Sequence, residues 1–298
     1  MTDDWRVVFD SRNRIACSDR ALVLAAAEIP HELIVDGSGF ALIVPAEFSA
    51  AAARELRLYD DENPPAVCRA PRRVPQRDPV PGIIGYLFVV CLVAWLAGIS
   101  AFGENWLAAG RVDGALIRDG DWWRLVTALT LHSGLPHLAG NIVFGTLFGL
   151  FAGRLLGSGI AWFAIVVTAA AGNLLNTLLL ESAHRSIGAS TAVFAALGLV
   201  AGFVWRARLM SQERWPYRVG PIVGGVALLM YTGTGDANTD VGAHLMGFVC
   251  GFLGGVVLVR FFDALDSGAL QWGCGVAALA LLCAAWLASL ASPAAPIM

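Results

Sequence analysis

Seven long apolar stretches follow one another through the last three quarters of this 298-residue chain. A helix needs about 20 consecutive apolar residues to cross the hydrocarbon core of a bilayer, so each stretch is a candidate span. The sequence therefore predicts a polytopic, all-α membrane protein. The stretches lie at residues 82–102, 137–157, 159–180, 190–207, 219–233, 241–262 and 268–291.

The charge distribution separates a polar head from this apolar body. Charged residues make up 14% of the chain, whereas soluble domains carry roughly 25%. More than half of the charged residues lie in the first 80 positions. The net charge is only −3 and the chain contains no long basic run, so we expect no nucleic-acid partner.

Residues 1–62 are expected to form a small soluble domain. Short apolar runs alternate with helical segments in the order βαββα, which is typical of an α+β sandwich of the ferredoxin-like type. Ser18 is the expected N-cap of the first helix. Residues 63–81, rich in proline and arginine, are expected to link this domain to the membrane. The predicted elements are strands Trp5–Phe9, His31–Val35 and Phe40–Val44 and helices Ser18–Ala27 and Glu47–Tyr59.

The six cysteines give no indication of a metal site or a disulfide framework. No two of them form a CxxC pair, whereas zinc sites and disulfide-rich domains use closely spaced cysteines. We therefore expect neither a disulfide framework nor a zinc site. Four of the cysteines lie inside apolar runs, namely Cys91, Cys250, Cys274 and Cys283.

Arginine placement predicts the orientation of the array, because cytoplasmic loops carry an excess of basic residues. If residues 1–62 lie in the cytoplasm, six arginines fall on inside loops, and the short outside loops carry only Arg185. Spans two, four and six then run from outside to inside, and the C-terminus lies outside. This favours a bacterial inner-membrane protein with a cytoplasmic N-terminus. The six arginines are Arg154, Arg206, Arg208, Arg214, Arg218 and Arg260.

Four polar residues fall near the outer ends of spans two, four and six in this topology. They are His137, Asn141, Ser190 and His244. Polar side chains at membrane depth are costly and tend to be functional. No acidic residue is expected at this depth, so any catalytic unit would be a Ser–His pair without a carboxylate.

Ser190 opens the fourth span and allows two interpretations. A serine at a helix start is commonly an N-cap, but a neighbouring base would make its hydroxyl a nucleophile. His244 is the candidate base, although a buried histidine can simply bond to another helix. Stripes of small residues would let spans four and six approach closely, and plain helix packing is part of their role. The stripes are Ser190, Phe194, Gly198 and Gly202 on span four and Gly247, Gly251 and Gly255 on span six.

His137 and Asn141 can both donate hydrogen bonds from one face of span two. Donors aimed at a developing oxyanion are worth about 3–4 kcal/mol each, whereas ordinary interhelical hydrogen bonds contribute about 0.6 kcal/mol. Either role fits the spacing. His132 either lines a water entrance or caps a loop, and Phe194 is placed to stack under the imidazole of the base.

These motifs resemble the rhomboid family of intramembrane serine proteases over about residues 82–262. Each motif alone is weak, but their order on spans two, four and six is specific. The resemblance is carried by Trp123-Arg124, by His132, His137 and Asn141 in an HxxxxHxxxN pattern, by Gly188-Ala189-Ser190, and by Ala243-His244 with Gly247 and Gly251.

The resemblance implies a six-helix catalytic core at 82–262, with a seventh span in residues 263–298. It implies Ser190 as the nucleophile and His244 as the general base. It also implies membrane-protein substrates, single-pass or polytopic, that are cut near the outer surface without a metal or cofactor. The loop at 232–240 would be a gate. The implied oxyanion hole is His137, Asn141 and the Ser190 amide, and the supporting residues are Gly188, Phe194, His132, Trp123 and Arg124.

Two positions depart from the family pattern. Thr191 stands where the family usually has glycine, and Phe194 stands where tyrosine is common. The alternative function is therefore a rhomboid-like protein that binds membrane clients and cuts them weakly or not at all. A transporter would show inverted repeats and a polar site at the midplane, which the sequence does not indicate.

Overall fold

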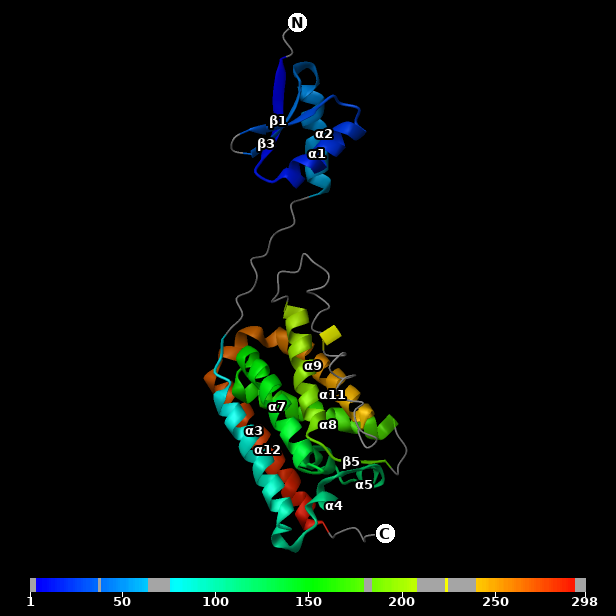
Figure 1. Ribbon diagram of the computed structural model, residues 1–298, viewed down its shortest axis with the longest axis vertical. Coiled ribbons are helices and arrows are strands. Elements are labelled where there is room, and N and C mark those ends of the chain that lie inside the picture. The colour runs from blue at the N-terminus through cyan, green and yellow to red at the C-terminus, as the bar shows by residue number, and fades with distance from the viewer. Residues whose placement is uncertain are drawn as a thin grey trace. The chain divides into compact units, whose positions relative to one another are not determined.

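The computed structural model describes residues 4–36, 39–63, 76–179, 184–207, 223–224 and 240–292. The chain divides into two compact units, Met1–Ala70 and Pro71–Met298 (Figure 1). Three predictions fall outside the described residues: most of the linker at 63–81, nearly all of the span at 219–233, and the gate up to residue 239.

The N-terminal unit has the predicted βαββα order. Its elements are β1 (Trp5–Ser11), α1 (Arg14–Ala26), β2 (Glu32–Asp36), β3 (Gly39–Pro45), the 3₁₀ turn η1 (Ala46–Phe48) and α2 (Ser49–Glu62). The sheet order is β1-β3-β2, with β3 antiparallel to both neighbours. The two outer strands therefore run parallel and are joined through α1, as in one half of a ferredoxin-like sandwich.

A small apolar core holds this unit together. Leu24 of α1 and Leu56 of α2 pack with Leu42 and Val44 of the central strand. The predicted N-cap is wrong, because α1 begins one turn earlier than Ser18. Its cap is Asn13, whose extended backbone lets the side-chain oxygen accept the Ile15 N–H at 3.0 Å.

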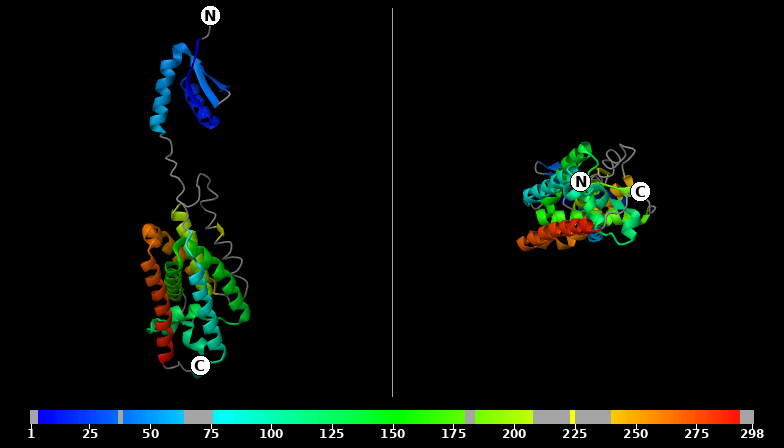
Figure 2. Two further views of the ribbon diagram at one scale, coloured as in Figure 1. Left: turned by 90° about the vertical axis from the view of Figure 1, so that its left-hand side faces the viewer. Right: turned by 90° about the horizontal axis from the view of Figure 1, so that it is seen from below.

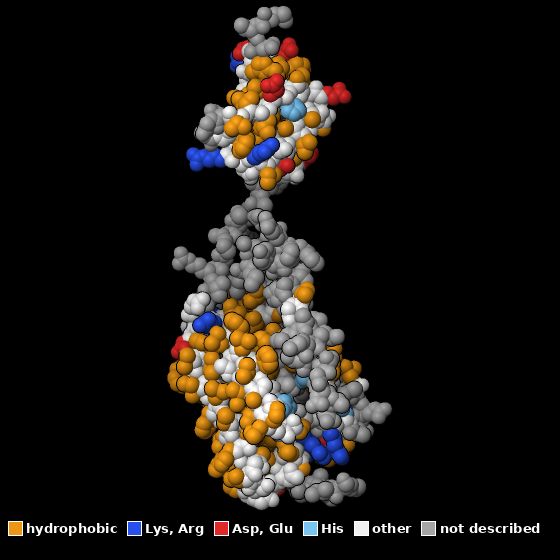
Figure 3. Space-filling view, viewed as in Figure 1, with side chains coloured by type: hydrophobic (Ala, Val, Ile, Leu, Met, Phe, Trp, Pro, Cys, Tyr) orange, Lys and Arg blue, Asp and Glu red, His pale blue; other side chains and the backbone are white. Residues whose placement is uncertain are grey.

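Six of the seven predicted spans appear as helices in the described residues. Hydrophobic side chains dominate the described surface of this unit in Figure 3, as expected for helices that face lipid. The helical membrane fold is therefore confirmed. The helices are α3 (Val80–Gly98), α7 (Leu135–Leu156), α8 (Ser158–Leu179), α9 (Ser190–Ala207), α11 (Val241–Leu258), which the 3₁₀ segment η4 (Val259–Asp266) continues, and α12 (Gly268–Ala291).

The segment between α3 and α7 is built from short elements that Arg124 holds together. Its guanidinium donates to the Asp121 carboxylate at 2.9 Å and to the carbonyl oxygens of Ala108 at 3.0 Å and Arg111 at 3.2 Å. The side chain is buried. The elements are η2 (Ala101–Gly103), α4 (Trp106–Gly110), β4 (Val112–Asp113), α5 (Gly114–Arg118), α6 (Arg124–Thr127) and η3 (Ala128–Thr130).

Helices α9 and α11 lie in close contact along their small residues, as predicted. A Cβ added at Gly251 would overlap the Ala195 carbonyl, and one added at Gly198 would overlap the Phe248 carbonyl. Each glycine therefore faces the backbone of the other helix. This approach brings the first turns of α9 and α11 together, as in other glycine-mediated helix pairs.

One glutamine fastens α12 to the turn between α7 and α8. Gln271 donates to the carbonyl oxygens of Leu156 at 2.7 Å and Leu265 at 2.9 Å, and its own oxygen accepts the Gly159 N–H at 3.0 Å. The amide thus pairs backbone groups that a helix end leaves without partners. Figure 2 shows α12, in red, along the outside of the helical bundle.

Candidate active site

Ser190 and His244 meet although 54 positions separate them in sequence. Ser190 is the first residue of α9, and His244 lies in the first turn of α11. The His244 Nε2 atom is 2.7 Å from the Ser190 Oγ atom. Only 6% of His244 is exposed. At this distance a neutral imidazole can accept the hydroxyl proton, which is what activates a serine.

The imidazole is oriented by stacking. The ring of Phe194, one turn after Ser190 on α9, lies 4.5 Å from the His244 ring at an interplanar angle of 32°. The Nδ1 atom of His244 is buried and has no hydrogen-bond partner within the described chain. The ring is therefore positioned by an aromatic face, with no carboxylate bonded to it among the described residues.

Contacts with Ser133 determine which tautomer of neutral His137 is present. The Nδ1 atom of His137 lies 3.4 Å from the backbone nitrogen of Ser133 and 3.0 Å from its hydroxyl. Because a backbone N–H can only donate, Nδ1 must accept, and the neutral ring carries its proton on Nε2. That Nε2–H is left as a donor in the cavity that His137 lines.

Asn141 presents a second donor. Its side chain is buried, and its Nδ2 atom has no partner among the residues that the structure describes. The Tyr86 hydroxyl donates to the Asn141 backbone carbonyl at 2.6 Å, which ties this turn of α7 to α3. Buried amide donors are almost always paired, so an unpaired one marks a place where a bond partner is expected.

Gly188 keeps open the space between the hydroxyl and these donors. A Cβ at this position would lie 2.8 Å from the Ser190 Oγ atom and 3.5 Å from the His137 Cε1 atom. The Ser190 amide stands at the N-terminus of α9, where the first N–H groups lack intrahelical partners and the helix dipole is positive. One cavity of about 860 Å³ is lined both by Ser190 and His244 and by the two donors, His137 and Asn141.

The remaining predicted residues lie around this cavity or support it. The His132 ring packs edge-on against His137 with centroids 5.6 Å apart. Thr191 is buried against α11, since a Cβ added at Gly247 would lie 3.0 Å from the Thr191 Cγ2 atom. Trp123 and Arg124 do not belong to the cavity lining; they hold the preceding segment, where Trp123 packs on an apolar cluster.

The carboxylate of Asp240 lines this cavity, although the sequence predicted no acidic residue at this depth. Asp240, one turn before His244, accepts bonds from the Ala243 N–H at 2.9 Å and the Asn176 amide at 3.0 Å, and it lies 2.7 Å from the His184 Nε2 atom. Burial raises the pKa of Asp240, but the Ala243 amide and the His184 ring outweigh burial and lower it overall.

These contacts join the segment before Ser190 to the start of the helix that carries His244. Sequence reasoning missed them, although an Asp three residues before Ala243 is a recognisable N-cap signal. Val112 and Asp113 of β4 pair with β5 (Arg185–Ser186), which ties the same segment to the chain between α3 and α7. In the described chain, no group of three His, Cys, Asp or Glu residues is placed to hold a metal ion.

Comparisons with known proteins match the region of the chain that contains these residues. A family model described as the Rhomboid domain matches residues 119–261, which include Ser190 and His244. The Bacillus subtilis protein YdcA, whose name assigns it to the rhomboid proteases, is 30% identical over 140 residues that cover 67% of its length and 46% of this chain. The chain belongs to the rhomboid family.

Other rhomboid relatives are longer than the matched region. Rhomboid protease GluP of Bacillus subtilis is 27% identical over 179 residues, which are 58% of this chain and 34% of GluP. Rhomboid-like protease 1 of Toxoplasma gondii is 30% identical over 178 residues, which are 57% of this chain and 58% of the relative. These rhomboid relatives support an intramembrane protease function and a multi-pass membrane location.

Proposed function

We propose that this chain is a serine endopeptidase that cuts transmembrane segments of membrane proteins near the outer face of the membrane. Ser190 is the nucleophile and His244 is the general base. The observation that carries the proposal is the 2.7 Å distance between the Ser190 Oγ and His244 Nε2 atoms. An imidazole at that distance is the partner that a serine hydroxyl needs to become reactive.

In the acylation step, the Ser190 oxygen attacks the carbonyl carbon of a substrate peptide while His244 Nε2 takes the hydroxyl proton. The tetrahedral adduct then collapses, the C–N bond breaks, and His244 returns the proton to the leaving amine. The product is an acyl-enzyme on Ser190 and a free amino terminus. Phe194 keeps the imidazole plane in place through both transfers, as its stacking distance of 4.5 Å supports.

The oxyanion of the adduct is stabilised by donors that have no other partner among the described residues. These are the His137 Nε2–H, the Asn141 Nδ2–H and the Ser190 amide. The unpaired Nδ2 atom of Asn141 supports this role. Donors already in position need no reorganisation when the charge develops, which is why such sites are effective.

In the deacylation step, His244 takes a proton from a water molecule as the water oxygen attacks the acyl carbon. The second adduct collapses, the ester bond breaks, and the proton returns to the Ser190 oxygen. The cavity of about 860 Å³ offers room for the water beside Ser190. No metal or cofactor is required for either step.

The topology proposed with this function puts residues 1–62 in the cytoplasm and the site toward the outer face of a bacterial inner membrane. Substrates are single-pass or polytopic membrane proteins in the same bilayer. Residues 82–262 form the catalytic core in this proposal, residues 63–81 link it to the N-terminal domain, and residues 263–298 carry the additional span. The excess of arginine on the inside loops supports this orientation.

The second candidate function is client binding with weak or no cleavage. The observation in its favour is Thr191, which replaces the usual glycine beside the nucleophile. Its methyl group lies against Gly247 of α11 and is directed at the helix contact. That position leaves the Ser190–His244 pair intact, so we favour the protease.

Cleavage of a single-pass model substrate in proteoliposomes distinguishes the protease from the client-binding protein. Wild type should release the two fragments, and both Ser190→Ala and His244→Ala should reduce cleavage to background. Ser158→Ala is the matched control, because Ser158 also starts a helix and donates only to the Asp78 carbonyl at 2.8 Å. Undiminished cleavage by Ser190→Ala, with the control also active, would refute the assignment. No cleavage by wild type with any of several substrates would favour the client-binding alternative.

A further inference from the structure

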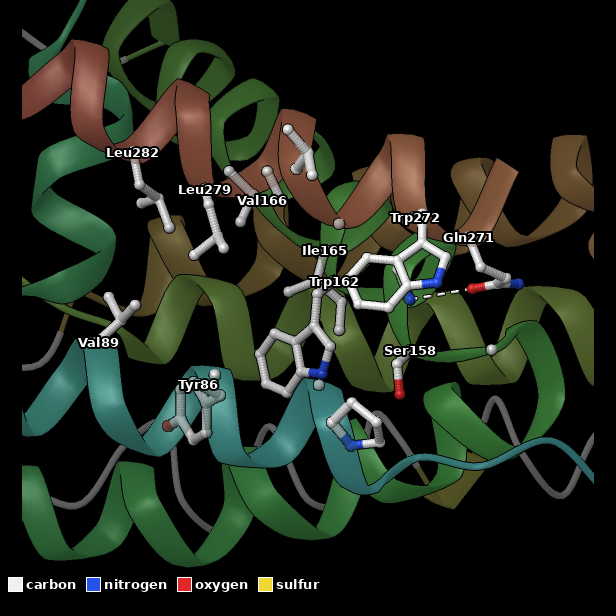
Figure 4. A pocket seen from close by; sticks show the side chains of 18 of the residues that line it. Tyr86, Val89, Ser158, Trp162, Ile165, Val166, Gln271, Trp272, Leu279 and Leu282 are labelled. Atoms are coloured by element: carbon white, nitrogen blue, oxygen red, sulfur yellow. Dashed lines mark hydrogen bonds between the residues drawn. The ribbon is translucent and has the colours of Figure 1, made fainter. Parts of the chain in front are cut away.

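A second cavity lies between α3 and α12, away from the dyad. Figure 4 shows Tyr86 and Val89 of α3 on one side, Leu279 and Leu282 of α12 on the other, and Trp162 of α8 between them. Its volume is about 600 Å³, which lies within the range of small-molecule sites. Neither Ser190 nor His244 lines it.

The lining is apolar along most of its length, and its charged residues lie at one end only. Arg77, Asp78, Ser158 and Gln271 gather where the chain enters α3 and where α8 and α12 begin. Gln271 is already committed to backbone groups. The exposed charge at this end therefore comes from the carboxylates of Asp78 and Asp266, because the Arg77 side chain is only 10% exposed and also donates to the Leu155 carbonyl.

Arg77 and Asp266 form an ion pair at 2.8 Å, in which the Asp266 side chain is 70% exposed. Asp78 caps α3 by accepting the Val80 N–H at 3.0 Å and is also exposed. Two exposed carboxylates beside one largely buried guanidinium offer contacts for the cationic part of a zwitterionic group. Their net negative charge disfavours an anionic group.

The position of the cavity indicates which kind of molecule binds there. Both of its walls, α3 and α12, are membrane-spanning helices, so the apolar part opens at the depth of lipid tails. Trp272, 79% exposed, stands at the polar end, and exposed tryptophans are characteristic of the membrane–water interface. Polarity along the cavity thus follows the order of a phospholipid, with a charged head and a long apolar tail.

We propose that the cavity between α3 and α12 binds one acyl chain of a zwitterionic membrane phospholipid, with its headgroup at Asp78 and Asp266. The ammonium group of the headgroup contacts these two exposed carboxylates. This site does not depend on the protease assignment, and its test uses no measurement of cleavage.

Gly85 gives a variant that fills the cavity without disturbing the helices. It lines the cavity, and a Cβ added there meets no atom within 4 Å. The side chain of Gly85→Leu would therefore occupy the space of the lipid tail. Gly273→Leu is the matched control, because Gly273 of α12 is equally open but is not part of the lining.

Native mass spectrometry measures the lipid bound to the full-length protein. The protein is extracted from vesicles that contain equal amounts of phosphatidylethanolamine and phosphatidylglycerol. Wild type and Gly273→Leu should each retain one phosphatidylethanolamine, and Gly85→Leu should retain at least about tenfold less, because each displaced methylene loses binding free energy. Unfolding temperatures of the three proteins establish that all are folded. If Gly85→Leu misfolds, Gly275→Leu replaces it, since a Cβ there is 3.7 Å from the nearest atom.

Equal retention by wild type and the cavity-filling variant would overturn the site. Absence of retained lipid in wild type would do the same, as would a retained peptide in place of lipid. Retention of phosphatidylglycerol as strongly as phosphatidylethanolamine would overturn the headgroup assignment. Asp78→Asn should weaken the preference for phosphatidylethanolamine without removing the bound chain.

Discussion

His244 shows how one side chain can be placed for proton transfer without a carboxylate bonded to it. Its Nε2 atom faces the Ser190 hydroxyl, and the Phe194 ring covers its plane. Aromatic stacking restrains the ring but leaves the Nδ1 atom without a bond in the described chain. In the proposed mechanism, the π face of Phe194 stabilises the positive charge that forms on the imidazole.

Asn141→Ala tests the oxyanion donors. Loss of the Nδ2–H should lower kcat by about 10²–10³, because the donor acts on the charge that exists only in the transition state. KM for a model substrate should change little. Steady-state cleavage kinetics in proteoliposomes measure both constants. A variant whose KM rises while kcat is unchanged would instead place Asn141 in substrate binding.

His132, which lies outside the membrane spans, should make the stability of the folded protein depend on pH. Burial lowers the pKa of His132 from 6.5 to about 4, and the neighbouring His137 contributes to the shift. Between these values the unfolded chain binds a proton that the folded chain rejects. Stability should therefore fall as pH falls from 6.5 toward 4, by at most about 1.4 kcal/mol per pH unit.

Thermal unfolding in detergent at pH 7.5 and pH 5 checks this expectation. The unfolding temperature of wild type should drop at pH 5, and His132→Leu should drop less because it has lost one titrating group. An equal drop in the two proteins would mean that His132 does not contribute.

The candidate catalytic residues could be predicted from the sequence, because rhomboid motifs and helical spacing both indicate them. Ser190 and His244 could be paired from the depth of their spans. Asp240 and His184 could not, since their bond joins two segments whose approach depends on how α9 packs on α11. Gln271 was missed for the same reason, because its partners other than Leu265 are backbone groups more than 100 positions away.

At the scale of elements, the contact between α9 and α11 sets the distance between Ser190 and His244. The glycines of each helix face backbone atoms of the other, so no side chain separates them. The stripes were predictable because residues at every fourth position share a helix face. Helix ends moved by up to four residues from the predictions, since hydropathy does not mark where capping groups end a helix.

Gly251→Val tests this contact. A side chain here would overlap the Ala195 carbonyl, so the helices must separate and the Ser190–His244 bond must lengthen. Cleavage should fall at least about 10²-fold, as expected for a misplacement of about 1 Å, and the unfolding temperature should drop. Gly273→Val, which meets open space, should retain both properties. Unchanged cleavage by Gly251→Val would show that the close approach is not required.

At the scale of the whole molecule, a charged α+β unit precedes a helical membrane unit that carries the candidate site. The βαββα order and the membrane fold followed from sequence, because strand and span patterns are local. Apart from the contact between α9 and α11, the sequence did not predict which spans touch one another, since lipid-facing and buried apolar residues look alike in composition. The attachment of α12 through Gln271 is an example.

Reporter fusions test the proposed topology. With seven spans and a cytoplasmic N-terminus, alkaline phosphatase fused after residue 298 should be active, because this enzyme folds only outside the cytoplasm. The same reporter fused after residue 62 should be inactive. Green fluorescent protein at the two positions should give the opposite pattern. Active phosphatase at both positions would require an even number of spans and would contradict the orientation.

The central claim is that His244 activates Ser190, and covalent labelling tests it most directly. A fluorophosphonate should modify wild type once, and peptide mapping should place the adduct on Ser190. The label should be absent from Ser190→Ala, strongly reduced in His244→Ala, and retained in Ser158→Ala. Labelling of Ser190 at the wild-type rate in the His244→Ala protein, or no labelling of wild type at all, would contradict the claim.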